Sequence, residues 1–101
     1  MRLRPNVDVN SQEIMTKLRQ SGVTVEPRLA GIGHGVPDLL CGFRGVNILL
    51  EVKRDDKGPA ARNLTADEQA WHEKWGGQVA VVANFDEAMD EILAQIERRE
   101  A

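Results

Sequence analysis

The spacing of hydrophobic residues changes several times along the chain, and each change predicts a new element of secondary structure. Apolar residues recur at helical spacing after Asn10, where capping side chains favour the start of a first helix, and the pattern stops at Ser21-Gly22. Residues 23–29, VTVEPRL, predict a short strand, which Pro27 places at an edge of the sheet or at a kink. The residues GIGHG at 31–35 predict a flexible loop.

Two apolar strands joined by a turn at Arg44-Gly45 are predicted within GVPDLLCGFRGVNILLEVKR, residues 35–54. Side chains alternate between the two faces of a strand. One face of the second strand is wholly apolar and should pack on a helix; it carries Val46, Ile48, Leu50 and Val52. The opposite face becomes polar toward the end of the strand, where Glu51 and Lys53 should project together.

A second helix is predicted from the capping box of Thr65 and Glu68 to the stop at Gly76-Gly77. Its tryptophans, Trp71 and Trp75, lie at i and i+4 in an apolar pattern. This spacing favours a place in the core over a role as a surface on which bases stack.

The rest of the chain predicts a buried strand at 78–83 and a last helix that begins near Asn84 or Asp86. The apolar face of that helix carries Ala88, Met89, Ile92, Leu93 and Ile96. The polar segment 55–63 is expected to be a loop. The order helix, three strands, helix, strand, helix predicts an α/β fold with a mixed sheet, an αβββαβ core and a C-terminal helix.

Length and composition narrow the class of protein. The 101 residues fit one domain, 1–101, and no apolar run approaches the roughly 20 residues that a membrane span needs. The net charge of −3 argues against a protein that coats nucleic acid by bulk charge, but a local basic patch stays possible. Cys41 is the sole cysteine, which fits a reducing compartment and a small buried side chain.

Asp38 is predicted to face Glu51 across the hairpin. With a two-residue turn at Arg44-Gly45, residues whose numbers sum to 89 are paired, and paired residues have Cβ atoms about 5 Å apart. Two carboxylates that close repel each other unless positive charge lies between them. Lys53 supplies one such charge, and Mg²⁺, which prefers carboxylates and water, would supply two more. A slip of one residue in the pairing would move one carboxylate to the other face.

The same three charges have a second interpretation. They could form an ordinary ion cluster on an uncovered face of the sheet, where it would contribute little stability. The matched carboxylates, and the lysine two residues from the glutamate on the same face, favour a functional site.

The sequence resembles a known family at these residues. Pro37-Asp38, with Glu51-Val52-Lys53 thirteen residues after the aspartate, resembles the motif of the PD-(D/E)XK nucleases. The blocks GVPDLL, LLEVKR, LTADEQAWHEKW and GGQVAVVANFDEAM resemble the stand-alone VRR-NUC domains of phages and bacteria, over roughly residues 10–95. The resemblance implies a restriction-endonuclease-like fold and metal-dependent hydrolysis of phosphodiester bonds.

The resemblance also implies roles for the motif residues. Asp38 and Glu51 would ligate Mg²⁺ or Mn²⁺, and the backbone carbonyl of Val52 would complete the protein's share of the ligands. Lys53 would position the attacking water or stabilise the negative charge that grows in the transition state. A bound metal would polarise the phosphate and lower the pKa of its water.

Two further polar residues are candidates for catalytic roles. Glu13, on the first helix, could be an accessory acid near the metal or a residue of the helix cap, and the two alternatives stand side by side. The resemblance places Gln69 close to Lys53, whereas the alternative is a solvated surface glutamine.

Several other residues could contact DNA. His34 lies in the glycine loop just before Asp38, although the loop could simply make a turn. His72 shares a helix face with Gln69 and could touch a phosphate, or it could be a half-buried histidine of no such role. Four basic residues near the site could form a local patch with Lys53; they are Arg44, Arg54, Lys57 and Arg62.

The sequence therefore predicts a DNA endonuclease that depends on Mg²⁺ or Mn²⁺. A chain this short has little surface for holding branched DNA alone, so we expect a homodimer. Resemblance to viral junction resolvases implies four-way (Holliday) junctions as substrate and the cytoplasm of a bacterial or phage-infected cell as location. The alternatives are another structure-specific or restriction-like nuclease of the superfamily, and a catalytically silent module that binds nucleic acid.

Overall fold

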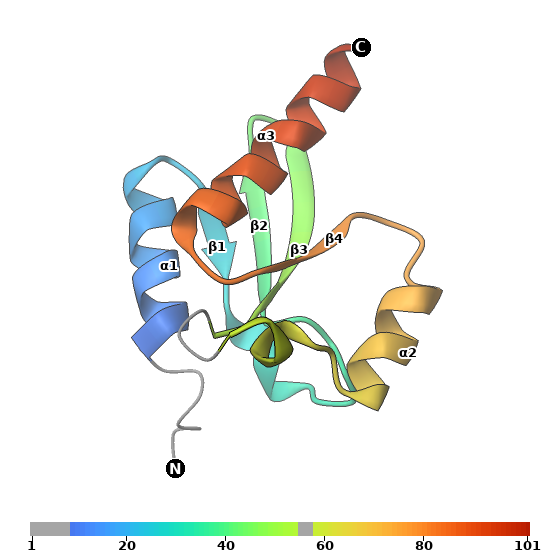
Figure 1. Cartoon of the computed structure of the whole chain (residues 1–101). Helices are drawn as coiled ribbons and strands as arrows, with labels where there is room; N and C mark the ends of the chain where they lie inside the picture. The colour runs from blue at the N-terminus through green and yellow to red at the C-terminus, as the bar shows by residue number, and fades with distance from the viewer. Residues whose placement is uncertain (1–8, 55–57) are drawn as a thin grey trace.

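A computed structural model of the chain describes residues 9–54 and 58–101 (Figure 1). It has the predicted α/β architecture, in which helices pack on both faces of one mixed sheet. The elements in chain order are α1 (Val9–Gln20), β1 (Thr24–Glu26), the 3₁₀ helix η2 (Arg28–Gly31), β2 (Leu39–Phe43), β3 (Val46–Val52), the 3₁₀ helix η3 (Pro59–Arg62), α2 (Ala66–Lys74), β4 (Val79–Val82) and α3 (Phe85–Glu100).

The four strands form a sheet in the order β1-β2-β3-β4. β1 pairs with β2, and β2 with β3, in antiparallel fashion, whereas β3 and β4 are parallel and joined through α2. The prediction of a mixed sheet is confirmed. β1 is an edge strand, as Pro27 directly after it favours.

The hairpin of β2 and β3 has the predicted register. Leu39 is paired with Leu50 and Cys41 with Ile48, so the numbers of paired residues sum to 89. The two-residue turn requires positive φ at both of its residues, and Arg44 (φ 50°) and Gly45 (φ 84°) have it. This register carries Asp38 and Glu51 to the same end of the hairpin.

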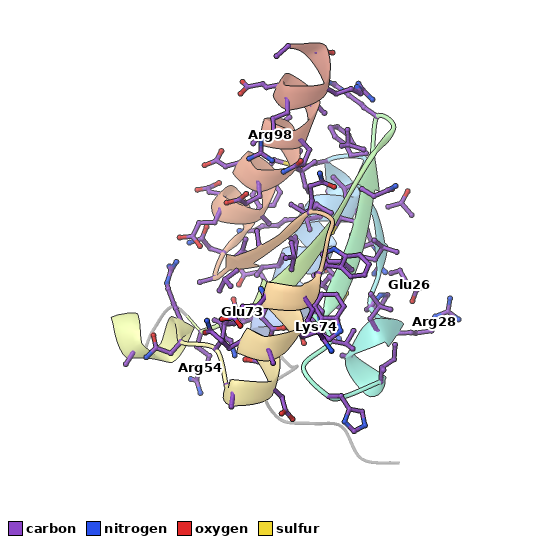
Figure 2. All side chains as sticks on the ribbon, turned by 90° about the vertical axis from the view of Figure 1, so that its right-hand side faces the viewer. Glu26, Arg28, Arg54, Glu73, Lys74 and Arg98 are labelled. Atoms are coloured by element: carbon purple, nitrogen blue, oxygen red, sulfur yellow. The ribbon has the colours of Figure 1, made fainter. Side chains whose placement is uncertain are left out.

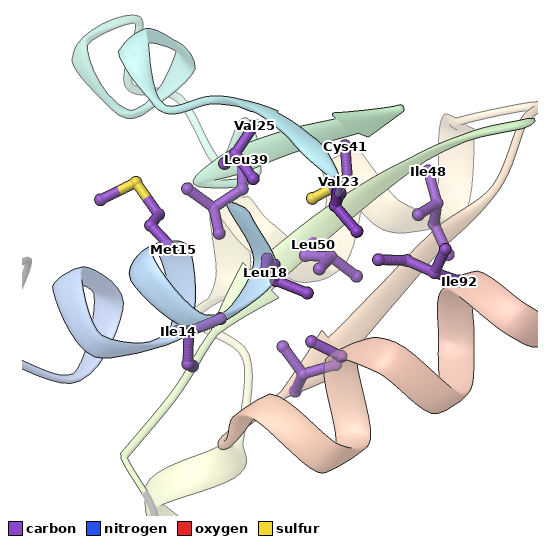
Figure 3. Packing of buried hydrophobic residues seen from close by; sticks show 12 residues of the cluster. Ile14, Met15, Leu18, Val23, Val25, Leu39, Cys41, Ile48, Leu50 and Ile92 are labelled. Atoms are coloured by element: carbon purple, nitrogen blue, oxygen red, sulfur yellow. The ribbon is translucent and has the colours of Figure 1, made fainter. Parts of the chain in front are cut away.

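The hydrophobic core lies between one face of the sheet and the helices α1 and α3. Leu18 of α1 and Ile92 of α3 are directed toward Leu50 of β3, and each is at most 1% exposed (Figure 3). Cys41 is buried in the same cluster, as predicted. Alternate side chains of β3 point into this core. The side chains between them, and those of Glu51 and Lys53 at the end of the strand, point to the other face, away from α1 and α3.

Several boundaries differ from the prediction. α1 includes Asn10, so the helix does not start after it; the Asn10 amide instead donates hydrogen bonds to the carbonyls of Lys53 (2.8 Å) and Ala83 (3.2 Å). β1 ends at Glu26 rather than 29, because the proline that follows removes a backbone donor. The predicted loop at 55–63 contains η3.

The capping predictions for the later helices are confirmed. Thr65 and Glu68 form a complete capping box at the start of α2. Asn84 caps α3 by accepting a hydrogen bond from the backbone of Glu87 at 2.8 Å. Leu93, however, is 40% exposed, so the prediction that it belongs to the buried face of α3 is wrong.

The prediction that the two tryptophans belong to the core is also wrong. α2 lies on the sheet face opposite α1 and α3, and it has no buried residue (Figure 1). The rings of Trp71 and Trp75 stack at 4.8 Å between centroids, and Trp75 is 45% exposed.

β4 is the other edge of the sheet, and Val82 is its one buried residue. Among residues 9–54 and 58–101, no helix combines the length and apolar character needed to cross a lipid bilayer.

Candidate active site

A pocket of about 340 Å³ opens where β2 begins and β3 ends. Asp38 and Glu51 line it from neighbouring strands, and Lys53 follows Glu51 on the same face. One oxygen of Asp38 accepts a hydrogen bond from the backbone N–H of Val52 at 2.8 Å, which fixes the aspartate across the end of the hairpin. The sequence-predicted cluster of two carboxylates and one lysine is therefore assembled by the register of two strands.

Glu51 is the carboxylate in the pocket whose negative charge is least favourable. Its side chain is 5% exposed, and its Oε1 atom is buried without a hydrogen-bond partner among the described residues. Burial, together with the negative charges of Asp38 and Glu68, raises its pKa from 4.5 to about 9. Burial also raises the pKa of Asp38, against the hydrogen bond from Val52. The negative charges of Asp38 and Glu51 are thus not neutralised by Lys53 alone.

Lys53 is held in place by both its side chain and its backbone. Its Nζ lies 2.7 Å from Glu68 Oε1 and 3.8 Å from Glu51 Oε2, and the side chain is 15% exposed. Its backbone N–H donates to the carbonyl of Val82 at 2.9 Å, and its carbonyl accepts from Asn10. The ammonium group therefore has a fixed position beside the two carboxylates.

Glu68 is a member of the site that sequence reasoning recognised only as a helix cap. Its Oε1 accepts hydrogen bonds from Lys53 Nζ and from the backbone of Thr65 at 2.9 Å. Burial by itself would raise the pKa of Glu68, but these hydrogen bonds outweigh it and lower the pKa. The capping box thus sets the position of the lysine. The signal was present in the sequence, since a capping box turns its acidic residue back toward the start of the helix.

The glycine loop closes the pocket against the start of α2. Gly35 has φ of +85°, and a Cβ at this position would overlap the backbone carbonyl of Asp67. The close approach requires glycine, because any side chain would push the loop and the helix apart. Gly33, Val36 and the buried Ser11 also line the pocket.

The donor set fits a hard divalent cation. Mg²⁺ and Mn²⁺ favour oxygen ligands, and Mg²⁺ is commonly held by one or two carboxylates while it keeps several waters. Two carboxylates and the carbonyl of Val52 would meet that need. Oε1 of Glu51, which has no hydrogen-bond partner among residues 9–54 and 58–101, is an oxygen that a cation would satisfy. Within the described residues, no group of three or more acidic, histidine or cysteine side chains is arranged to hold a metal. A protein share of two carboxylates and one carbonyl agrees with that finding.

The two secondary catalytic candidates lie outside the pocket. Glu13 is exposed and pairs with Lys17 one turn along α1, at 3.5 Å. Gln69 is also exposed, and its amide donates to Glu73 at 2.9 Å. The structure brings Glu68 to Lys53 where the resemblance suggested Gln69. One residue rotates a helix by about 100°, so an error of one position changes the face.

The residues predicted to contact DNA differ in where they lie relative to the pocket. Arg54 lines the pocket and lies beside η3 (Figure 2). His34 is an exposed member of the glycine loop, with φ of 58°. His72 is half-buried, burial lowers its pKa, and its Nε2 has no hydrogen-bond partner among the described residues. Arg62 pairs with Glu87 at 2.9 Å, and Lys57 lies outside the described residues.

Arg44 does not flank the pocket, so that part of the prediction is wrong. It occupies the hairpin turn, where its guanidinium lies 4.9 Å from the centroid of the Phe43 ring. The turn is six residues from Asp38 along an extended strand, which corresponds to about 20 Å. The basic residue therefore lies at the opposite end of the hairpin from the carboxylates.

Comparison with known proteins bears on the fold. No family model matches the sequence, and no curated protein matches it. A solved structure described as a "VRR_NUC domain" is similar to the chain, with a TM-score of 0.62 and 26% sequence identity. The similarity covers 81% of this chain and 88% of the solved chain, so it includes nearly the whole of both folds.

Proposed function

We propose that the chain, whose fold and sequence are similar to those of a solved VRR_NUC domain, is a metal-dependent DNA endonuclease that hydrolyses phosphodiester bonds. One observation carries the proposal. Glu51 keeps a buried carboxylate oxygen with no hydrogen-bond partner in the described part of the chain, next to Asp38 and a fixed lysine. A cluster that served only stability would satisfy its buried oxygens within the protein.

Asp38, Glu51 and the carbonyl of Val52 would hold Mg²⁺ or Mn²⁺. Such an ion, when bound, polarises a phosphate and makes its water a better nucleophile. Asp38 is oriented for this role by its hydrogen bond from Val52, which fixes one of its carboxylate oxygens at the end of β3. Glu51 must lose its proton to become a ligand, so a raised pKa links metal binding to release of a proton.

Lys53 acts as a fixed cation beside the reacting phosphate. Its hydrogen bond to Glu68 restricts the ammonium group to the wall of the pocket, where it can orient a water or stabilise negative charge on the phosphate. Since Glu68 also belongs to the capping box of α2, it ties the catalytic lysine to the start of that helix. Arg54, at the pocket wall, is positioned to contact the DNA backbone.

The substrate we propose is branched DNA, with four-way junctions as the leading example, cut by a homodimer. A net charge of −3 leaves one small domain with little electrostatic grip on duplex DNA. Two copies would supply two pockets for two strands, and a two-fold dimer is the commonest symmetric assembly.

A panel of DNA substrates tests this proposal. Linear duplex, flap, splayed and four-way DNA would be incubated with the protein in Mg²⁺, in Mn²⁺ and in chelator. We expect metal-dependent nicking, with four-way DNA cleaved fastest. Equal cleavage of duplex and junction would refute the substrate, while binding without nicking in either metal would favour a catalytically silent module.

A further inference from the structure

A pocket of about 390 Å³ lies at the end of the sheet opposite the candidate active site. It is formed where β3 and β4 begin and where α3 ends. Two arginines and three amide side chains supply its polar groups, and none of the described residues that line it is acidic. We call it the arginine pocket; its polar lining comprises Asn47, Gln78, Gln95, Arg98 and Arg99.

Helical spacing brings the polar side chains of α3 to one face. Gln95, Arg98 and Arg99 are related as i, i+3 and i+4, so they are neighbours on the helix surface, whereas Glu97 does not line the pocket. Gln95 is a polar residue that is only 7% exposed, and its Oε1 accepts a hydrogen bond from Nη1 of Arg98 at 3.1 Å. A buried amide thus holds the guanidinium of Arg98 at the pocket.

The hydrogen bonds that hold the two arginines use neutral acceptors, so they leave the positive charges in place. Arg98 donates to an amide oxygen and forms no ion pair with a residue in the described part of the chain. Nη1 of Arg99 donates to the backbone carbonyl of Arg44. The ion pair of Arg99 with Glu100 is 3.9 Å long between largely exposed side chains, and such a pair contributes little.

The hairpin turn adds a third cation to this end of the molecule. The guanidinium of Arg44 lies 4.9 Å from the centroid of the Phe43 ring, and its carbonyl is the acceptor for Arg99. A Cβ at Gly45 would lie 2.7 Å from Nη1 of Arg99, so glycine at the turn leaves room for that guanidinium. The arginines of the turn and of the helix end therefore form one basic surface.

The chemistry of the lining selects an oxyanion as the ligand. Guanidinium and amide groups all donate hydrogen bonds, and guanidinium matches the geometry of phosphate in a bidentate contact. Cations in the last turn of a helix also interact favourably with the helix dipole. That effect explains neither the amide of Asn47 and Gln78, which come from the sheet, nor the arginine of the turn.

We infer that the arginine pocket binds a backbone phosphate of DNA, at a distance from the phosphate that is cut. This inference rests on the proposed function, which makes DNA the substrate. Asn47 and Glu51 are four residues apart on the same face of β3, which corresponds to about 13 Å. One strand of duplex DNA carries a phosphate for about every 3.4 Å of helix axis, so the second contact lies about four or more base pairs away.

The two contacts together would orient the DNA on the protein. Figure 2 shows Arg98 on α3 toward one end of the molecule and Arg54, at the wall of the active-site pocket, toward the other. Phosphate contacts fix the register and direction of a protein on DNA without reading its sequence. The arginine pocket would therefore set the direction in which the DNA leaves the active site, and it supplies local positive charge to a chain whose net charge is −3.

The experiment measures DNA binding separately from cleavage. The affinity of the full chain for labelled four-way DNA would be measured by fluorescence anisotropy, in chelator and at several salt concentrations. The variants are Arg98→Gln, Arg98→Lys and Arg99→Gln. Arg28→Gln is the matched control, because it removes the same charge from an exposed arginine that lies outside the pocket and pairs with Glu26 at 2.6 Å.

Arg98→Gln should weaken binding about five- to tenfold at about 0.1 M salt, and should lower the slope of log affinity against log salt by about one unit, because one phosphate contact is lost. Arg99→Gln should act in the same direction. Arg98→Lys should keep the slope, and Arg28→Gln should behave as wild type. At saturating DNA the single-turnover rate of Arg98→Gln should equal that of wild type. Circular dichroism checks that each variant is folded.

A set of junctions that carry one neutral methylphosphonate each locates the contact. At the contacted position the neutral group should weaken binding of wild type but not of Arg98→Gln, because the same contact is already lost. If the neutral group weakens both proteins equally at every position, the inference is overturned. This arm also tests wild type without any change in the protein.

Equal affinities and salt slopes for Arg98→Gln and wild type would overturn the inference, as would an equal loss in Arg28→Gln. Inorganic phosphate is tested at constant ionic strength. If it raises the melting temperature of wild type but not of Arg98→Gln, while both bind DNA equally, the pocket holds free phosphate and the DNA contact is refuted. If the contact is found but no metal supports nicking, the proposed function fails while the DNA contact stands.

Discussion

Replacing Glu51 by glutamine should make the metal-free protein more stable at neutral and alkaline pH, although it should abolish metal binding. Glutamine has nearly the shape of a protonated glutamate and can still donate a hydrogen bond to Asp38. In the folded protein Glu51 is surrounded by two other carboxylates and is almost fully buried. The negative form of Glu51 therefore opposes folding unless a cation is present.

The size of the effect follows from the raised pKa. A carboxyl whose pKa is 4.5 in the unfolded chain and about 9 in the folded one binds its proton more tightly when folded. Stability therefore falls as pH rises from 4.5 toward 9, by about 1.4 kcal/mol for each pH unit, and is unaffected by this group below 4.5. At pH 8 the penalty reaches about 5 kcal/mol, a large part of what a small domain has.

Urea denaturation in chelator, at about pH 5 and about pH 8, measures the penalty. Wild type should lose stability between the two conditions, whereas Glu51→Gln should lose much less and should exceed wild type at the higher pH. Glu97→Gln, at an exposed position, is the control and should follow wild type. Added Mn²⁺ should stabilise wild type and Glu97→Gln but not Glu51→Gln. Equal free energies of unfolding for wild type and Glu51→Gln at pH 8 would refute the argument that Glu51 is a strained charge.

Three further predictions concern the lysine, the glycine loop and the cysteine. Lys53→Met should keep DNA binding in Ca²⁺ but reduce single-turnover cleavage on the order of 100-fold or more, and an undiminished rate would remove Lys53 from catalysis. Gly35→Ala should lower the melting temperature and the cleavage rate through its overlap with Asp67. Gly33→Ala, which also has positive φ but open space around its Cβ, should show the backbone penalty of about 1 kcal/mol alone, so equal losses would contradict the overlap. Burial raises the pKa of Cys41 to about 12, so a thiol-specific disulfide reagent should react at neutral pH only after denaturation; rapid reaction of the native protein would show that the thiol is accessible.

The site could be predicted from the sequence where it depends on backbone periodicity. Strand alternation put Glu51 and Lys53 on one face, and a turn that tolerates positive φ at Arg44-Gly45 fixed the partner of Glu51. Both steps depend only on local backbone geometry. The same reasoning placed the capping box of α2 and the cap of α3 correctly.

The errors arose where packing between distant elements decides the outcome. An i, i+4 pair of tryptophans is compatible with a core helix and with a surface patch, and the sequence does not reveal that α2 lies apart from α1 and α3. Glu68 and Gln69 differ by one helical position, so only the docking of α2 on the sheet reveals which side chain meets Lys53. Arg44 is near the motif in sequence but lies at the far end of the hairpin, because the distance between residues grows quickly along an extended strand.

The most direct test of the central claim is single-turnover cleavage of four-way DNA by wild type and by Glu51→Gln, in Mg²⁺, in Mn²⁺ and in chelator. We predict nicking by wild type in at least one metal, none in chelator, and none by Glu51→Gln in any condition, although the variant is folded and binds the DNA. Cleavage by folded Glu51→Gln at the rate of wild type, or cleavage by wild type in chelator, would contradict it.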